Sequence, residues 1–404
     1  MTLPKPNVSF KIPSIHDDIE LDCRIYYPRR TERNFRAFAR SFAIFAHPYA
    51  PLGGSYDDPV VALAGSVLLQ QGFLLTTFNF RGAAGSGGRT SWSGKPELSD
   101  YVSVYGFLLH YIDTIFRGAE EQPSRNGPPQ LVLGGYSYGS MIASHLPSMS
   151  VVVNLLQSAA PDSAETEIKH RAEELSRDAR AYFEIYSAPT TLTVRMSPGK
   201  SREQTRKPKP GVVMGGYESG RISRENSRKS VDAERIRESL DKLRRKIGSR
   251  PNSPSPSSTA PASEPVTSPP AQSAPTMSPG VAYLIVSPIL SMAASFTTMF
   301  SKLRFVVKGH PTVFSSEREF HQLTVHPCCC LYGNKDVFTS VRKLQRWTEE
   351  LKSRPGSRFM AIEADAGHFW HEADGIVQFK QGVAEFLETL TSQHAASAED
   401  DGRL

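Results

Sequence analysis

The sequence has little cysteine: its 404 residues include four, Cys23 and the run Cys328–Cys330. None of them stands in a C-x-x-C pair, so the pattern indicates neither a disulfide framework nor a zinc ribbon. Neighbouring residues of a strand point to opposite faces, so the run of three cannot surround a metal ion by itself. We therefore expect buried, reduced thiols, no bound metal and no cofactor.

Long apolar runs are also scarce. The N-terminus, Met1–Pro6, lacks the apolar core of a signal peptide, which favours a cytoplasmic location. One nearly uncharged stretch, residues 280–300, has about the length of a membrane span. Pro288 and several Ser and Thr residues interrupt it, so a buried parallel strand at Ala282–Val286, followed by a loop and a short helix, explains it better. A membrane span stays the alternative, and we expect no stable one.

The excess positive charge of the chain is confined to one segment. The formal net charge is +6, but residues 191–280 carry 17 Lys and Arg against 8 Asp and Glu, a local charge of +9 that leaves −3 for the rest. The main body is therefore mildly acidic, and we predict no nucleic-acid partner. The sequence does not indicate the oligomeric state.

The basic segment lacks the composition of a folded domain. Between Arg250 and Pro279 it is almost wholly Ser, Pro, Ala and Thr, which bury too little apolar surface to fold. We predict that residues 191–279 are a disordered insertion and residues 393–404 a flexible tail. Within the insertion, the apolar spacing of Ser230–Lys246 indicates either a transient basic helix or a solvated segment.

The rest of the chain alternates strand and helix patterns. This alternation predicts an α/β fold with a mainly parallel sheet and right-handed crossovers, opened by two antiparallel strands joined at a polar turn. Residues 8–190 and 280–392 together have the size of one domain. The other expected strands are Val8–Pro13, Ile19–Tyr27, Ser41–Ala46, Phe73–Phe80, Gln130–Gly135, Thr324–Tyr332 and Arg358–Glu363, and the expected helices are Val60–Gln71, Leu98–Phe116, Ser163–Tyr186, Ser340–Leu351 and Gly375–Leu390.

The most informative motif is Gly135-Tyr136-Ser137-Tyr138-Gly139. It follows an apolar run and leads into a helix start, the strand–turn–helix setting of a nucleophile elbow. The turn is so tight that a side chain at either flanking glycine would clash with neighbouring backbone. The pattern predicts that Ser137 is presented as a nucleophile, at a helix N-terminus that favours a developing oxyanion.

A serine nucleophile needs a base, and the base needs an acid that holds its tautomer. Asp336 follows one predicted strand and His368 follows the next, which completes the order Ser, Asp, His. Other histidines fit less well, since His47 and His310 each lie near a proline and neither follows the acid. Asp365 is the alternative acid, but it lies too near His368 in sequence to reach the imidazole, so we expect it to cap or pack.

Acyl transfer also needs two backbone donors for the oxyanion. The residue after the nucleophile, Tyr138, supplies one, and the loop His47–Gly54 supplies the other. Two prolines in that loop have no N–H, which leaves Tyr49 or Ala50 as the donor, and we prefer Tyr49. A merely tight turn is the alternative.

A second glycine-rich segment, Arg81–Gly88, invites comparison with a phosphate-binding loop. No Lys-Ser or Lys-Thr pair follows it, so we interpret it as a structural turn in which Arg81 bonds neighbouring carbonyls.

In combination, these motifs resemble the α/β-hydrolase superfamily over residues 8–190 and 280–392. The pattern His47-Pro48, Leu52-Gly53-Gly54 and Phe78–Gly82 is similar to poorly characterised hydrolases of the X-Pro dipeptidyl-peptidase and serine-aminopeptidase type. The resemblance implies a mainly parallel central sheet flanked by helices and a catalytic triad of Ser137, His368 and Asp336. It further implies a variable helical cap, for which residues 149–190 are the candidate. The long insertion departs from the family pattern.

These features predict a serine hydrolase that cleaves a carboxylic ester, or a thioester or amide, of a small-molecule acyl substrate through an acyl-enzyme. Tyr49, Tyr136 and Tyr138 would line an aromatic pocket mouth that favours apolar acyl groups. A serine aminopeptidase-like peptidase is the second enzymatic interpretation. A different class, an interaction protein with a phosphorylatable basic loop, is suggested by the Ser-Pro pairs at Ser253, Ser255 and Ser268.

Overall fold

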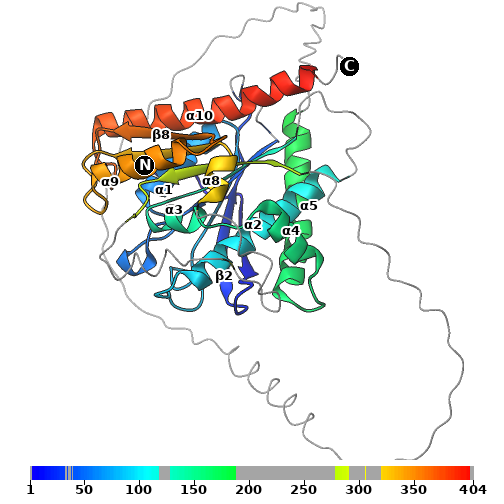
Figure 1. Ribbon diagram of the computed structural model, residues 1–404. Coiled ribbons are helices and arrows are strands. Elements are labelled where there is room, and N and C mark those ends of the chain that lie inside the picture. Colours follow the sequence, from blue (N-terminus) through cyan, green and yellow to red (C-terminus); the bar gives the residue numbers. More distant parts are fainter. Residues whose placement is uncertain are drawn as a thin grey trace, which may run out of the picture. The chain divides into compact units, whose positions relative to one another are not determined.

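The strands of the described residues form one sheet in the order β1-β2-β4-β3-β5-β6-β7-β8 (Figure 1). The first pairings are antiparallel, β1 with β2 and β2 with β4, and all the others are parallel. The carboxyl ends of parallel strands share one edge, where open α/β sheets bind ligands. The strands are β1 Val8–Pro13, β2 Glu20–Tyr26, β3 Ser41–Ala46, β4 Leu74–Phe78, β5 Gln130–Tyr136, β6 Gly280–Val286, β7 Cys328–Gly333 and β8 Phe359–Ala364.

This arrangement is that of a computed structural model, which describes residues 2–31, 34, 38, 40–117, 128–187, 278–290, 305 and 320–400. All of them belong to one of the two units of the chain, Met1–Thr190 with Ala271–Leu404. The insertion predicted at 191–279 lies outside the described residues except for its last two positions, and so does the helix expected at Ser230–Lys246.

Helices cover both faces of the sheet. On one face α1 (Pro59–Gln70) packs against α10 (Ala373–Asp400). In Figure 1 α10 lies along the top of the sheet, α2 and α4 lie below it, and α5 runs along its right side. The helices of this second face are α2 Lys95–Phe116, α3 Tyr138–Ala143, α4 Met149–Gln157, α5 Ala164–Ser187, α8 His321–Val325 and α9 Val341–Lys352.

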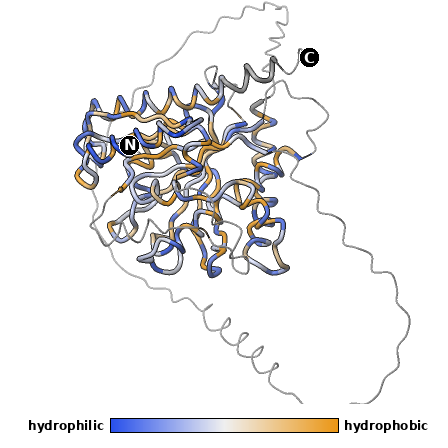
Figure 2. The backbone as a smooth tube through the Cα atoms, viewed as in Figure 1, coloured by the Kyte–Doolittle hydropathy of each residue, from blue (hydrophilic) through white to orange (hydrophobic). Residues whose placement is uncertain are grey.

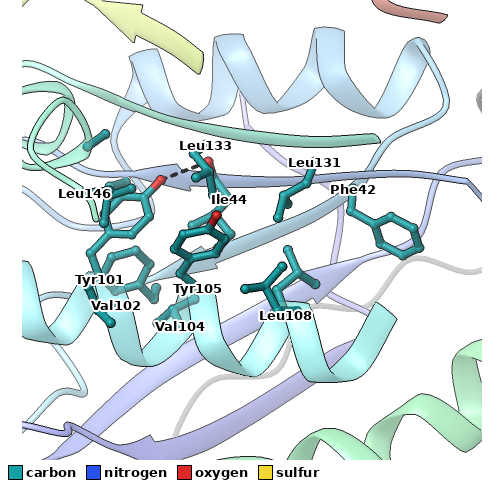
Figure 3. Close-up of a cluster of buried hydrophobic side chains, with 14 of the residues drawn as sticks. Phe42, Ile44, Tyr101, Val102, Val104, Tyr105, Leu108, Leu131, Leu133 and Leu146 are labelled. Atoms are coloured by element: carbon teal, nitrogen blue, oxygen red, sulfur yellow. Dashed lines mark hydrogen bonds between the residues drawn. The ribbon is translucent and has the colours of Figure 1, made fainter. Parts of the chain in front are cut away.

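The burial of each strand follows from its place in the sheet. The inner strands β3, β4, β5 and β7 are buried along their whole length, because both faces are covered, whereas the outermost strands β1 and β8 are partly exposed. Figure 2 shows apolar residues concentrated in the central strands and alternating with polar ones along the helices. Figure 3 shows the apolar contact of α2 with the sheet. There the Tyr101 hydroxyl also hydrogen-bonds Ile44 O of β3 and Gly134 O of β5, at 3.4 and 2.9 Å.

Most element bounds agree with the sequence predictions to within three residues, with two exceptions. The strand predicted at Thr324–Tyr332 is wrong in its first part, because α8 ends at Val325 and β7 begins only at Cys328. Pro327 explains the break, since it disfavours helix in the residue before it and has no N–H for a strand ladder. The terminal helix α10 is also longer than predicted and continues past Leu390 to Asp400.

The predicted cap region forms helices that lie against α2. Helices α4 and α5, from the predicted cap, both pack against α2, and α5 also contacts β1 at the edge of the sheet. A covering role for residues 149–190 stays a prediction.

In the stretch 280–300 the described part begins with strand β6, as predicted, and no described helix is long and apolar enough to cross a membrane.

All four cysteines are free and buried. Cys328 and Cys330 lie in the apolar cluster on the α2 face, and Cys329 lies in the cluster on the opposite face, as the alternation along a strand predicts. Burial raises the pKa of each thiol, so none of them has the character of a reactive thiolate.

Candidate active site

Ser137 stands on a strained turn between β5 and α3. Its φ of 58° and ψ of −113° lie outside the regions that L-residues favour. The turn is possible because backbone passes close to both flanking glycines. A Cβ on Gly135 would lie 2.5 Å from Gly139 C, and a Cβ on Gly139 would lie 2.5 Å from His47 O. The predicted need for glycine at both positions is therefore confirmed.

The structure brings Ser137, His368 and Asp336 into one hydrogen-bonded chain. His368 Nε2 lies 2.9 Å from Ser137 Oγ, and His368 Nδ1 lies 2.7 Å from Asp336 Oδ2. All three side chains are buried. A carboxylate oxygen can only accept a hydrogen bond, so His368 Nδ1 must be the donor to Asp336. The geometry therefore fits an imidazole that carries its proton on Nδ1 and accepts the Ser137 hydroxyl on Nε2.

The acid is itself held by backbone. Asp336 Oδ1 accepts the N–H groups of Phe338 and Thr339 at 2.8 and 3.0 Å, which leaves Oδ2 for His368. The alternative acid, Asp365, instead forms an exposed ion pair with Lys335 at 2.8 Å. Among the two candidate carboxylates, Asp336 is thus the one that orients the imidazole.

These three residues occupy fixed places in the sheet order. Ser137 follows β5, Asp336 follows β7 and His368 follows β8, all at the carboxyl edge of the parallel strands. The strand order, with its one antiparallel second strand, and the order Ser, Asp, His decide the fold. The chain has the α/β-hydrolase fold.

Comparison with solved structures finds several proteins to which the chain is similar. It is similar to the esterase Est2 of Thermogutta terrifontis (11% identity, 96% of each chain covered, TM-score 0.44). It is also similar to α/β serine hydrolases of Xanthomonas campestris (12% identity, 96% of this chain and 97% of the other, TM-score 0.43) and Coxiella burnetii (12% identity, 95% and 98%, TM-score 0.43).

Sequence comparison adds one relative. An uncharacterised protein of Schizosaccharomyces pombe is 28% identical over 130 residues, which is 32% of this chain and 50% of that protein. The chain thus matches about half the length of this curated relative. No protein-family model matches the chain. The similarity to X-Pro dipeptidyl-peptidases and serine aminopeptidases stays a prediction.

The loop predicted to supply an oxyanion donor of this α/β-hydrolase site lies against the elbow. Tyr49 precedes a short 3-10 helix, η1 (Ala50–Leu52), and its carbonyl accepts the N–H groups of Leu52 and Gly54. The Tyr49 and Tyr138 rings lie 5.1 Å apart, so the two predicted donor residues are brought together. Their role at an oxyanion stays a prediction.

His47, which sequence reasoning set aside as a base, ties this loop to the turn after β4. Its Nε2 accepts Phe80 N–H at 2.9 Å, and its Nδ1 therefore donates to Pro48 O at 2.5 Å. The side chain is fully buried, and burial lowers its pKa from the usual 6.5 to about 4. A neutral His47 with one fixed tautomer thus ties the loop His47–Gly54 to the turn after β4. The other histidine set aside, His310, lies outside the described residues.

The glycine-rich turn is structural, as predicted, but the predicted partners of Arg81 are wrong. Its guanidinium binds the carboxylates of Asp100, at 2.6 and 2.9 Å, and of Asp17, at 3.0 and 3.1 Å, rather than neighbouring carbonyls. The Asp100 side chain is fully buried, so the pair needs this dense bonding to offset the loss of solvation.

The aromatic surroundings of the site differ from the prediction. Tyr136 is buried, and its hydroxyl donates to His368 O at 3.1 Å, so it supports the base and does not line a mouth. Phe338 and Phe369 were missed, although they stand next to the triad in sequence. Their ring centroids lie 4.5 and 5.4 Å from the His368 ring.

A second contact that the sequence did not reveal joins β6 to the loop of the base. Trp370 Nε1–H donates to Ser287 Oγ at 2.9 Å, and both side chains are buried. Both residues also have positive φ, 54° and 45°. The sequence signal was the run Gly367-His368-Phe369-Trp370, which gave no reason to assign Trp370 a partner.

Proposed function

We propose that this chain is a serine hydrolase that cleaves carboxylic esters through an acyl-enzyme. The observation that carries the proposal is the hydrogen-bonded chain from Ser137 Oγ through His368 to Asp336. Such a chain on a nucleophile elbow makes the serine hydroxyl reactive, because the imidazole takes its proton and the carboxylate stabilises the imidazolium.

The reaction runs in two halves. Ser137 Oγ attacks the ester carbonyl carbon while its proton passes to His368 Nε2, and the resulting oxyanion binds the N–H groups of Tyr138 and Tyr49. Collapse of this intermediate breaks the bond to the alcohol, which leaves with the proton from His368. Water then attacks the acyl group on Ser137 by the same proton transfers in the reverse direction, and the carboxylic acid is released.

The oxyanion assignment draws support from the packing of the two loops. Gly139, at the start of α3, lies so close to Ala46 O and His47 O that a Cβ there would approach both within 2.7 Å. This contact fixes the oxyanion loop against the elbow before substrate binds, which is the preorganisation that stabilises a developing charge.

The proposal is tested by replacing the nucleophile. We expect the full-length chain to hydrolyse p-nitrophenyl acetate and to be labelled by a fluorophosphonate, and Ser137→Ala to lose both, with kcat reduced by about 10³-fold or more. The matched control is Ser144→Ala. Ser144 is also buried, and among the described residues its hydroxyl bonds only the local Met141 O and the neighbouring His145 ring.

Labelling of Ser137→Ala at the rate of the unmodified chain contradicts the assignment of the nucleophile. Hydrolysis of aminoacyl p-nitroanilides in preference to esters would instead favour the peptidase interpretation, with the same three residues in the same roles.

A further inference from the structure

Large apolar side chains are exposed at the carboxyl edge of the sheet. Val337 is 78% exposed after β7, Phe369 is 49% exposed after β8, and Leu52 is 72% exposed in the loop after β3. An exposed apolar side chain is ordinary when it stands alone. Three of them follow strands whose ends lie at the edge that carries the nucleophile, and grouped apolar exposure is typical of places where a ligand or partner binds.

The aromatic rings beside the base give this surface its shape. The Phe338 ring lies 4.5 Å from the His368 ring, and the Phe369 ring lies 5.8 Å from Phe338 at an angle of 78°. His371 stacks on Phe369 at 5.8 Å and 19°. The rings therefore form a continuous series from the buried imidazole to the surface.

The positions of these rings are fixed by the triad itself. Phe338 N–H binds Asp336 Oδ1, and Phe369 is the residue after His368. The backbone of both residues is therefore tied to the acid and the base, which keeps the two rings beside the His368 imidazole.

The chemistry of the base decides which part of an ester meets these rings. His368 Nε2 must donate its proton to the leaving oxygen, so the alcohol portion of the ester lies beside the imidazole. Three rings flank the imidazole: Phe338 at 4.5 Å, Tyr136 at 5.3 Å and Phe369 at 5.4 Å. Tyr136 is fully buried, so Phe338 and Phe369 are the two that a substrate can reach. We infer that these two residues form the binding surface for the alcohol portion, and that the enzyme prefers esters of apolar alcohols. The inference rests on the proposed hydrolase function and names its substrate class.

A series of alkyl acetates tests this inference, because the acyl group stays constant while the alcohol lengthens from ethyl to hexyl. We expect kcat/KM to rise about four-fold for each added methylene, the gain from removing one methylene from water. In Phe369→Ala, and in Phe338→Leu, the gain for each methylene falls below about 1.5-fold. Ring removal at the half-exposed Phe369 leaves the unfolding transition unchanged, so the effect is not one of folding.

Two controls locate the effect. Val377→Ala removes a 61% exposed apolar side chain on α10 and keeps the slope of the unmodified chain. A second series, p-nitrophenyl acetate to p-nitrophenyl hexanoate, varies the acyl group, and Phe369→Ala leaves that slope unchanged.

Each other outcome overturns the inference in its own way. A flat alkyl acetate series, with acetates still cleaved, contradicts the apolar alcohol surface while the hydrolase function stands. A loss of slope in the acyl series alone assigns the rings to the acyl group. Failure to cleave any ester removes the proposed function and this inference together.

Discussion

His47 is fully buried, accepts Phe80 N–H on Nε2 and donates to Pro48 O from Nδ1. Protonation of Nε2 would break the first of these bonds, and burial holds the pKa of the side chain near 4, below its usual 6.5. Above pH 6.5 the imidazole is neutral in the folded and the unfolded chain. Between pH 6.5 and 4 only the unfolded chain takes up the proton, so the free energy of unfolding falls as the pH falls.

We expect this single residue to remove roughly 3 kcal/mol of stability between pH 7 and pH 4. His47→Gln keeps an acceptor for Phe80 N–H but cannot titrate, so its stability should fall less over the same range. Urea unfolding of both proteins at several pH values measures the difference. His16→Gln, in the exposed turn between β1 and β2, is the control for loss of a histidine. Parallel curves for the unmodified chain and His47→Gln would contradict the assignment.

At the scale of elements, the end of β6 and the loop after β8 are joined by the hydrogen bond from Trp370 to Ser287. Strand β6 also accepts the Ser137 N–H on Val286 O at 2.9 Å, so the strand lies between the nucleophile and the loop of the base. Both joined residues hold positive φ, a conformation that the surrounding structure must enforce. We therefore expect the contact to help keep His368 within reach of Ser137.

Trp370→Phe removes the donor and keeps most of the ring. We expect kcat and the rate of fluorophosphonate labelling to fall together by about ten-fold, with KM little changed, and the free energy of unfolding to drop by about 1–3 kcal/mol. Ser287→Ala should have the same effect, and the double variant should be no worse than either single one. Trp92→Phe, at a 70% exposed tryptophan, is the control. A fall in stability without a fall in labelling rate would limit Trp370 to a structural role.

The arrangement of strands and loops explains why the sequence predicted the triad but not its surroundings. Ser137, Asp336 and His368 each follow an apolar strand pattern, and strand ends at one edge must meet, so their order sufficed. The partner of Trp370 depends on how two loops approach each other in space, which no spacing encodes. The start of strand β7 was misplaced because Thr324 and Val325, which favour strands, stand just before the break at Pro327.

At the scale of the whole molecule, the sheet pairs two neighbouring strands that lie far apart in the sequence. Strands β5 and β6 pair over seven residues, from Gln130 with Gly280 to Tyr136 with Val286. The contacts that hold Ser137 thus come from residues 8–187 and 278–400. Residues 201–270 supply none of the contacts described for the site, and they carry 15 Lys and Arg against 8 Asp and Glu.

Deletion of residues 201–270 leaves 20 residues between Ser187 and Ser278, enough to span about 66 Å when extended. We expect the rate of p-nitrophenyl acetate hydrolysis to be unchanged and the free energy of unfolding to change by less than about 1 kcal/mol. The formal charge falls from +6 to −1, so the shortened chain should no longer bind a cation exchanger at neutral pH. Replacement of the same residues by a Gly/Ser segment of equal length is the control for length. Loss of activity in both variants would show that the segment contributes to the site.

The positions of Ser137 and His368 in the sequence also decide when the site can be complete during synthesis. Ser137 and His368 are 231 positions apart, so at the usual speed of translation the nucleophile precedes its base by roughly 10–50 s. β7 and β8 are added only toward the end of that interval, and until His368 follows them the Ser137 hydroxyl has no imidazole beside it. With the proposed function, a ribosome-bound chain that stops before residue 368 is inert toward esters, and the growing polypeptide cannot consume acyl compounds around it until His368 has been added.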